Sequence, residues 1–135
     1  MRRSQRPDDR RNDSARSHGC PPVAGNLPAE LTAFVGRTAE LTALPAALAS
    51  ARLVTVTGVG GVGKSRLAVR VAAAVGPRDG AWLVELAGVR DPHLVEHAVA
   101  GALELTDHTS RSPRQVLLDR LAGRELLLVV DGFEH

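Results

Sequence analysis

The sequence has few or none of the features that mark several large classes of protein. Its 135 residues include one cysteine, Cys20, which excludes an internal disulfide framework and zinc clusters built from several cysteines. No run approaches the roughly 18 apolar residues that a membrane span needs, and the amino terminus lacks the apolar core of a signal peptide. We therefore expect a cytoplasmic protein of at most one domain, with no membrane partner.

Lysine is almost absent too. Of the 17 basic residues only Lys64 is a lysine, and six of the arginines lie in residues 1–20. Residues 1–25 have no hydrophobic pattern, which predicts a disordered basic tail or a linker, with order starting near residue 26. An arginine-rich tail can also contact the phosphates of a nucleic acid, so a nucleic-acid-binding protein is an alternative.

The rest of the sequence alternates between helical and extended patterns, which is typical of an α/β fold with a parallel sheet. Apolar or β-branched runs predict strands at residues 52–57, 81–86 and 125–131. Apolar stripes, cap residues and breakers predict helices at residues 38–51, from 64 to 75, from 92 to 103 and from 113 to near 123. Pro45 is expected to kink or delay the first helix, and the third strand is expected to be buried on both faces.

A glycine-rich loop lies between the first predicted strand and the helix that begins at residue 64. It fits the pattern G-x-x-x-x-G-K-[ST], in which backbone N–H groups wrap a polyphosphate closely and glycines allow that approach. The predicted nucleotide-binding residues are Gly58, Val59, Gly60, Gly61, Val62, Gly63, Lys64, Ser65 and Arg66. The same glycines also fit a G-x-G-x-x-G dinucleotide site, but the following Lys-Ser favours a nucleoside triphosphate.

Two side chains after the loop have distinct expected roles. Lys64 is expected to bridge β and γ phosphate oxygens with a compact ammonium, a task for which the broad fork of arginine is poorly shaped. Ser65 is expected to coordinate Mg²⁺. The helix they open directs its positive end toward the phosphates. ATP or ADP with Mg²⁺ is therefore the predicted ligand.

The third predicted strand ends in an acidic residue. Leu126–Val130 followed by Asp131 has the form of a Walker B strand, and Asp131 is predicted to reach toward Mg²⁺. Hydrolysis also needs a group that orients the attacking water, and Glu134 and His135 are candidates by their position in the sequence. The predicted catalytic residues are Asp131 and Glu134, and the predicted metal ligands are Ser65 and Asp131.

Four separated segments, in this order, resemble the ATPase region of large bacterial transcriptional regulators, namely LuxR-family and related regulators of the STAND class, which is similar to the NB-ARC domain. The segments are residues 26–37, 53–65, 82–86 and 126–135. The lysine-poor composition also resembles that of a high-GC actinobacterium. The resemblance covers residues 26–135 and implies a P-loop NTPase fold.

The resemblance implies further properties. Val35 and Arg37 match the family segment near the adenine and ribose, so they are expected to contact the base side. Exchange of ADP for ATP is expected to act as a switch between a closed and an open state. The implied partners are regulatory domains or other protomers, and DNA contact is expected only through other domains.

Three departures from the family pattern matter, and one of them is Pro45, which is unusual in the first helix. Family members usually read Asp-Asn-Cys-Glu-His where this chain has Gly132 and Phe133 after Asp131, which predicts weak hydrolysis. In the family the next strand inserts between the phosphate-loop strand and the Walker B strand, and no such strand follows here. We therefore expect an incomplete domain of marginal stability. The alternatives are a P-loop phosphotransferase or kinase, and a truncation that binds nothing.

Overall fold

The computed structural model describes residues 24–30, 33–106 and 110–133. In these ranges the chain forms two strands and four α-helices, with one 3₁₀ turn, η1, leading into the third helix. In chain order they are α1 (Thr38–Ser50), α2 (Lys64–Val75), β1 (Ala81–Glu85), η1 (Pro92–Leu94), α3 (Val95–Ala102), α4 (Pro113–Leu121) and β2 (Leu127–Asp131). None of the described helices is long and apolar enough to cross a membrane.

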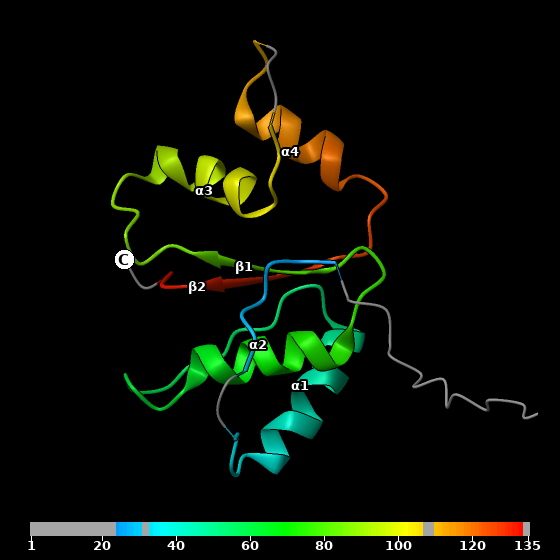
Figure 1. Ribbon diagram of the computed structural model, residues 1–135, viewed down its shortest axis with the longest axis vertical. Coiled ribbons are helices and arrows are strands. Elements are labelled where there is room, and N and C mark those ends of the chain that lie inside the picture. The colour runs from blue at the N-terminus through cyan, green and yellow to red at the C-terminus, as the bar shows by residue number, and fades with distance from the viewer. Residues whose placement is uncertain (1–23, 31–32, 107–109, 134–135) are drawn as a thin grey trace, which may run out of the picture.

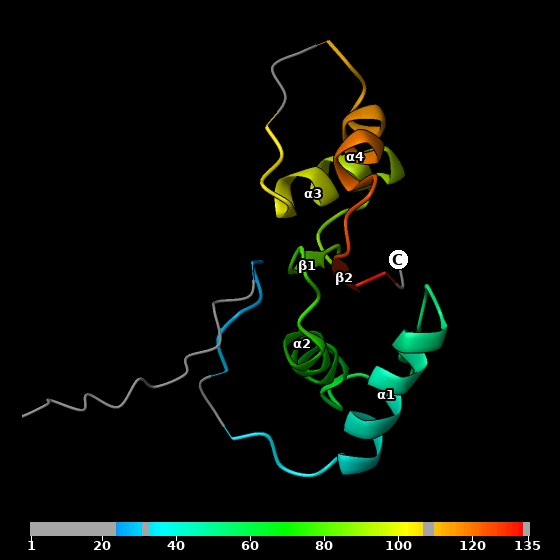
Figure 2. The ribbon, with the colours of Figure 1, turned by 90° about the vertical axis from the view of Figure 1, so that its right-hand side faces the viewer.

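The elements form three layers, with the sheet between two layers of helices (Figures 1 and 2). Helices α3 and α4 cover one face of the sheet, α2 covers the other, and α1 packs on the outside of α2. The two strands are parallel and adjacent, in a register that runs from Ala81 opposite Leu127 to Glu85 opposite Asp131. The predicted α/β class with a parallel sheet is therefore confirmed.

The core lies mainly between α2 and the sheet. Helix α2 buries an apolar face that includes Leu67, Val69, Val71 and Ala72, while the opposite face carries its arginines. Ala72 packs in one cluster with residues from both strands. By contrast, α1 has no fully buried residue, although Leu41, Leu44 and Leu48 are partly covered. The helix that follows the glycine loop is therefore the one fixed most firmly to the sheet.

The residues before α1 run along the free edge of β1. Ala24 accepts a hydrogen bond from the N–H of Ala81 at 3.0 Å. The Asn26 side chain then substitutes for a strand residue: its Oδ1 accepts from Leu83 N–H at 2.6 Å and its Nδ2 donates to Leu83 O at 2.9 Å. These bonds satisfy backbone groups that an edge strand would otherwise expose.

Signals between residues close in the sequence determine where several helices begin and end. Ser112 and Gln115 form a capping box at the start of α4, and Asp91 caps η1 by accepting from His93 N–H. Helix α2 ends at Gly76 as predicted, because glycine readily adopts the left-handed φ of 53° found there. Helix α1 continues through Pro45 instead of starting after it. The cost of an interior proline is therefore absorbed without ending the helix.

Two strand predictions are wrong. Residues 52–57 form no strand, although Val54 and Val56 are half-buried and Leu53 is 83% exposed, as an alternating strand would have them. A strand needs a hydrogen-bonded neighbour, and no described segment lies in that place. Strand β2 is also not buried on both faces, because Val130 is 45% exposed. Among the described residues, 52–57 thus lack a hydrogen-bonded neighbour, and the face of β2 that carries Val130 is not covered by a helix as the α2 face is.

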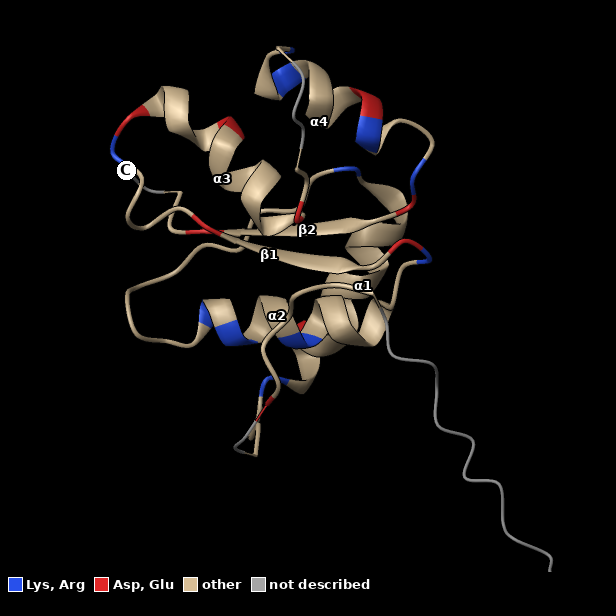
Figure 3. Cartoon of the chain, turned by 45° about the horizontal axis from the view of Figure 1, so that its top comes forward, with Lys and Arg blue, Asp and Glu red and all other residues tan. Residues whose placement is uncertain are grey.

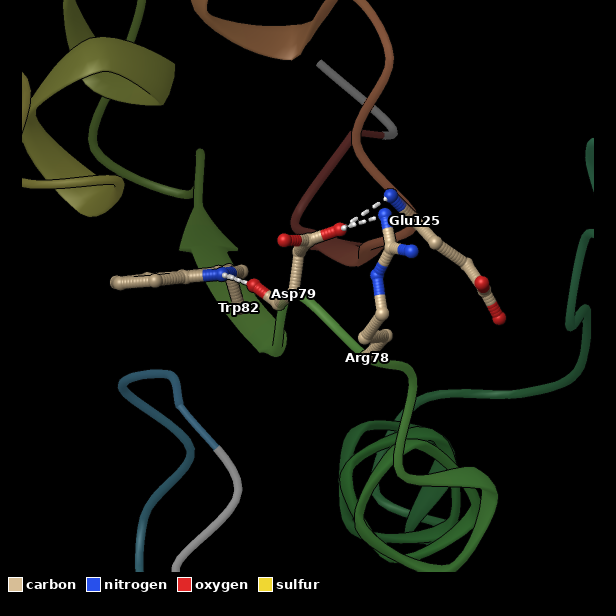
Figure 4. A network of polar contacts seen from close by, with 4 residues as sticks. All are labelled: Arg78, Asp79, Trp82 and Glu125. Atoms are coloured by element: carbon tan, nitrogen blue, oxygen red, sulfur yellow. Dashed lines mark hydrogen bonds and ion pairs between the residues drawn. The ribbon is translucent and has the colours of Figure 1, made fainter.

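A polar clasp joins the turns that precede the two strands (Figure 4). Asp79 N–H donates to Glu125 O at 2.8 Å, and Asp79 Oδ2 accepts from Glu125 N–H at 2.7 Å. Arg78 lies 3.4 Å from the same carboxylate oxygen, and Trp82 Nε1 donates to Asp79 O. The hydrogen bond from the Glu125 amide, followed by the nearby Arg78 charge, holds the pKa of Asp79 below its ordinary value.

This clasp predicts a loss of stability in acid. Because the pKa of Asp79 is lower in the folded chain, its ionised form stabilises the fold above the unfolded pKa, near 3.8, and that stabilisation is lost as the pH falls through the folded pKa. Thermal melts of the wild type and of Asp79→Asn, from pH 7 down to pH 3, should differ at neutral pH and converge in acid. Asp119→Asn, an exposed acid on α4, controls for the loss of one charge. A constant difference between wild type and Asp79→Asn across this range would contradict the prediction.

Candidate functional site

The glycine loop, residues 58–63, connects the extended chain 52–57 to the first turn of α2. Gly61 and Gly63 have φ angles of 75° and 82°, in the left-handed region that side-chain-bearing residues rarely adopt. A Cβ atom added at Gly60, Gly61 or Gly63 would meet nothing within 4 Å. Gly61 and Gly63 are thus favoured by backbone conformation, and the space in front of the loop is open to a ligand.

Helix α2 begins at this space, and the backbone N–H groups of its first turn receive no side-chain cap. Its N-cap, Gly63, has no side chain to accept from them, and the first helical bond is from Leu67 N–H to Gly63 O. Helix α4 differs, because the Ser112 hydroxyl accepts from its first turn. Helix α2 also has no acidic residue in its first turn. An uncapped helix start of this kind favours an anion.

Lys64 folds its side chain back over the loop. Its Nζ donates to Gly58 O at 2.9 Å and to Val59 O at 3.0 Å, so the ammonium lies across the loop opening. The contacts are with neutral carbonyl groups, which an anionic ligand can replace with stronger charge-assisted bonds. The only lysine of the chain is therefore positioned where a phosphate group at the loop would meet it.

Ser65 and Asp131 occupy the same end of the molecule. The carboxyl ends of both strands and the amino end of α2 lie on the same side of the molecule in Figures 1 and 3, in adjacent layers, because α2 runs opposite to the strands. The Ser65 hydroxyl is exposed, and Asp131 is half-buried at the end of β2. Neither side chain has a hydrogen-bond or ion-pair partner within the described ranges. Both are therefore available as oxygen ligands.

Residues 33–37 bring the Arg37 side chain to the loop. Arg37 Nη2 donates to Val62 O, inside the loop, at 2.5 Å, and Arg37 Nη1 lies 3.7 Å from Glu40. Arg37 itself has a φ of 56° at the N-cap of α1, an uncommon value for a residue with a side chain. Val35 is 89% exposed. The structure thus places the Arg37 guanidinium on the loop backbone.

Phe34 lies in the segment that was expected near the nucleotide, but it was not among the predicted site residues. Its ring is half-buried beneath two guanidinium groups of α2, with Arg70 Cζ 5.2 Å and Arg66 Cζ 5.6 Å from the ring centroid. The spacing of these arginines, four residues apart on one helix, places them on one face, but only the tertiary structure shows what that face holds. The sequence therefore indicated that Arg66 and Arg70 share a helix face, but not that Phe34 packs against them.

Sequence comparisons connect the chain to mycobacterial proteins. Over 90 residues, 67% of the chain, it is 42% identical to proteins of Mycobacterium tuberculosis and Mycobacterium bovis that carry the provisional name of HTH-type transcriptional regulator. Over 107 residues, 78% of the chain, it is 39% identical to an uncharacterized Mycobacterium tuberculosis protein. The matches span 10% and 27% of the length of these curated relatives. No protein-family model matches the chain, and no solved structure matches it significantly.

The residues after Asp131 explain one departure in the sequence. Gly132 has a φ of 76°, and a Cβ atom there would lie 2.6 Å from Ala87 N. Any larger residue, asparagine included, would force the two backbone segments apart. Glycine at this position is thus a requirement of the packing between the ends of β1 and β2. The candidate residues Glu134 and His135 lie outside the described residues.

Proposed function

We propose that the chain binds ATP or ADP with Mg²⁺ at the glycine loop, as the nucleotide-switch part of a bacterial transcriptional regulator with a P-loop NTPase fold. One observation carries the proposal: the Lys64 ammonium lies across a glycine loop that leads into an uncapped helix start. Backbone N–H groups, a helix end and a compact cation all favour the same ligand group, a polyphosphate. Ordinary glycine turns do not combine these three features.

The residues around the loop fit Mg²⁺ as the accompanying ion. Among the described residues no group of three or more His, Cys, Asp or Glu side chains could hold a metal by itself. Mg²⁺ in nucleotide sites usually takes one or two protein oxygens and completes its shell with phosphates and water. Ser65 and Asp131, unpaired at the same end of the molecule, would supply those oxygens. The bound ion would neutralise phosphate charge.

Two further observations support the wider proposal. Strand β1 is adjacent to β2, and residues 52–57 stay unpaired, which agrees with a family in which another strand separates the phosphate-loop strand from the Walker B strand. The names of the mycobacterial relatives support a regulatory role. The partners we propose are therefore an adenine nucleotide and further regulatory domains or protomers, with DNA contacted by those other parts.

The proposal is tested by titrating the purified chain with fluorescently labelled ATP and ADP, with and without Mg²⁺. We expect saturable binding below about 1 mM, as is usual for nucleotide sites, with ATP binding strengthened by the ion. Unlabelled GTP as competitor measures the preference for adenine. A chain with a cooperative thermal melt that ignores adenine and guanine nucleotides at millimolar concentration would overturn the proposal.

A further inference from the structure

The segment before α1 is fastened to α2 by a cluster of charged and aromatic groups. Phe34 packs beneath the guanidinium groups of Arg66 and Arg70, at 5.6 and 5.2 Å from its ring centroid. Arg70 also forms an ion pair with Glu30, and Arg66 donates to Ala33 O at 3.5 Å. A guanidinium over an aromatic face is attracted by the ring electrons. The ring is thus held from one side of α2 by two cations of adjacent turns.

The same segment reaches the glycine loop three residues later. Three residues span at most about 10 Å, so fixing Phe34 restricts the positions that Arg37 can take. Arg37 then adopts its left-handed φ of 56° and donates to Val62 O. An uncommon backbone conformation persists only where its surroundings hold it in place. Fixing the Phe34 ring therefore also helps to fix the position from which the Arg37 guanidinium donates.

The carbonyl that receives this bond lies between Gly61 and Gly63. Glycine imposes little conformational preference of its own, so interactions from outside the loop determine which conformation it keeps. The Arg37 bond comes from a part of the chain 25 residues away. A loop held in its binding conformation before the ligand arrives avoids an ordering cost when the ligand binds.

We propose that Phe34 is a positioning residue for the glycine loop, acting through Arg37 and not by contact with the nucleotide. This inference rests on the proposed nucleotide site for its effect on affinity. It also concerns the order of the loop in the nucleotide-free chain, which can be measured separately. Arg66 and Arg70 hold the Phe34 ring by cation–π contacts. The backbone connects Phe34 to Arg37, whose guanidinium donates to Val62 O.

The test compares Phe34→Ala, Phe34→Tyr, Arg37→Ala and the double variant Phe34→Ala/Arg37→Ala. Labelled ATP should bind each alanine variant about tenfold more weakly, the size expected for a residue that acts through another. Phe34→Tyr keeps the ring face and should restore binding to within about twofold. The double variant should bind no worse than the weaker single variant, whereas independent effects would multiply to about a hundredfold.

Amide hydrogen exchange without nucleotide provides the second readout. Exchange of residues 58–65 should accelerate in Phe34→Ala and in Arg37→Ala, while exchange in α4 stays unchanged. Leu118→Ala, an exposed leucine of α4, is the matched control and should alter neither measurement. If the wild type bound no nucleotide but the loop still became labile in both variants, the proposed function would fail and the positioning role would stand.

Three results would overturn the positioning role. They are wild-type loop exchange in Phe34→Ala, multiplied losses in the double variant, and a Phe34→Tyr variant as weak as Phe34→Ala. Phe34→Leu is the control for loss of the fold in Phe34→Ala, because leucine keeps apolar bulk but removes the ring face. An unfolded Phe34→Leu chain would be a fourth such result, because it would make Phe34 an ordinary packing residue.

Discussion

Replacing Lys64 by alanine should weaken ATP binding by about 100-fold or more while leaving the fold intact. Each charge-assisted hydrogen bond contributes about 1.5–3 kcal/mol, and an ammonium between two phosphates makes at least two. The folded chain loses little, because Lys64 bonds only to two loop carbonyls that are otherwise open to water. Titration with labelled ATP and a circular dichroism melt of the same sample measure the two effects separately.

Two matched variants sharpen this prediction. Lys64→Arg keeps the positive charge but replaces a compact ammonium with a planar fork, so most of the affinity should still be lost. Arg52→Ala removes one exposed positive charge at the start of the segment before the loop, and it should bind ATP within about twofold of the wild type. Equal binding by wild type and Lys64→Ala would show that the loop is not a phosphate site.

Features set by neighbouring residues could be predicted from the sequence. The capping box of Ser112 and Gln115, the stop at Gly76 and the amphipathic face of α2 each depend on residues a few positions apart. Strand β2 was also expected, although it begins at Leu127, two residues later than the predicted strand. The loop was found by its spacing, because the conformation of Gly61 and Gly63 leaves few other residue types possible.

Features set by distant partners could not be predicted. Residues 52–57 alternate as a strand does, but whether such a segment becomes a strand depends on a neighbour that its own sequence does not specify. The contact of Phe34 with Arg66 and the bond from Arg37 to Val62 join positions that no local pattern relates. The tight approach of Gly132 to Ala87 likewise depends on how the strands pair.

Leu67→Ala should cause the largest loss of stability in the chain. Leu67 is 1% exposed, lies in the first turns of α2 and is among the largest fully buried side chains. Truncating a buried leucine to alanine costs about 2–5 kcal/mol through lost burial and the cavity left behind. In a chain with so small a sheet, we expect a thermal midpoint lower by about 10 °C or more. Leu118→Ala, 59% exposed, should cost less than about 0.5 kcal/mol.

Leu67→Ala also tests whether ATP that binds at the glycine loop stabilises the folded chain. A ligand that binds only the folded chain raises stability by RT ln(1 + [L]/Kd), about 2.7 kcal/mol at a hundredfold excess over Kd. Saturating Mg²⁺–ATP should therefore recover much of the midpoint lost in Leu67→Ala, because Leu67 lies behind the loop and not in it. The double variant Leu67→Ala/Lys64→Ala should gain nothing from ATP. Equal recovery in both variants would mean that ATP stabilises the chain elsewhere, and the glycine loop would lose its proposed role.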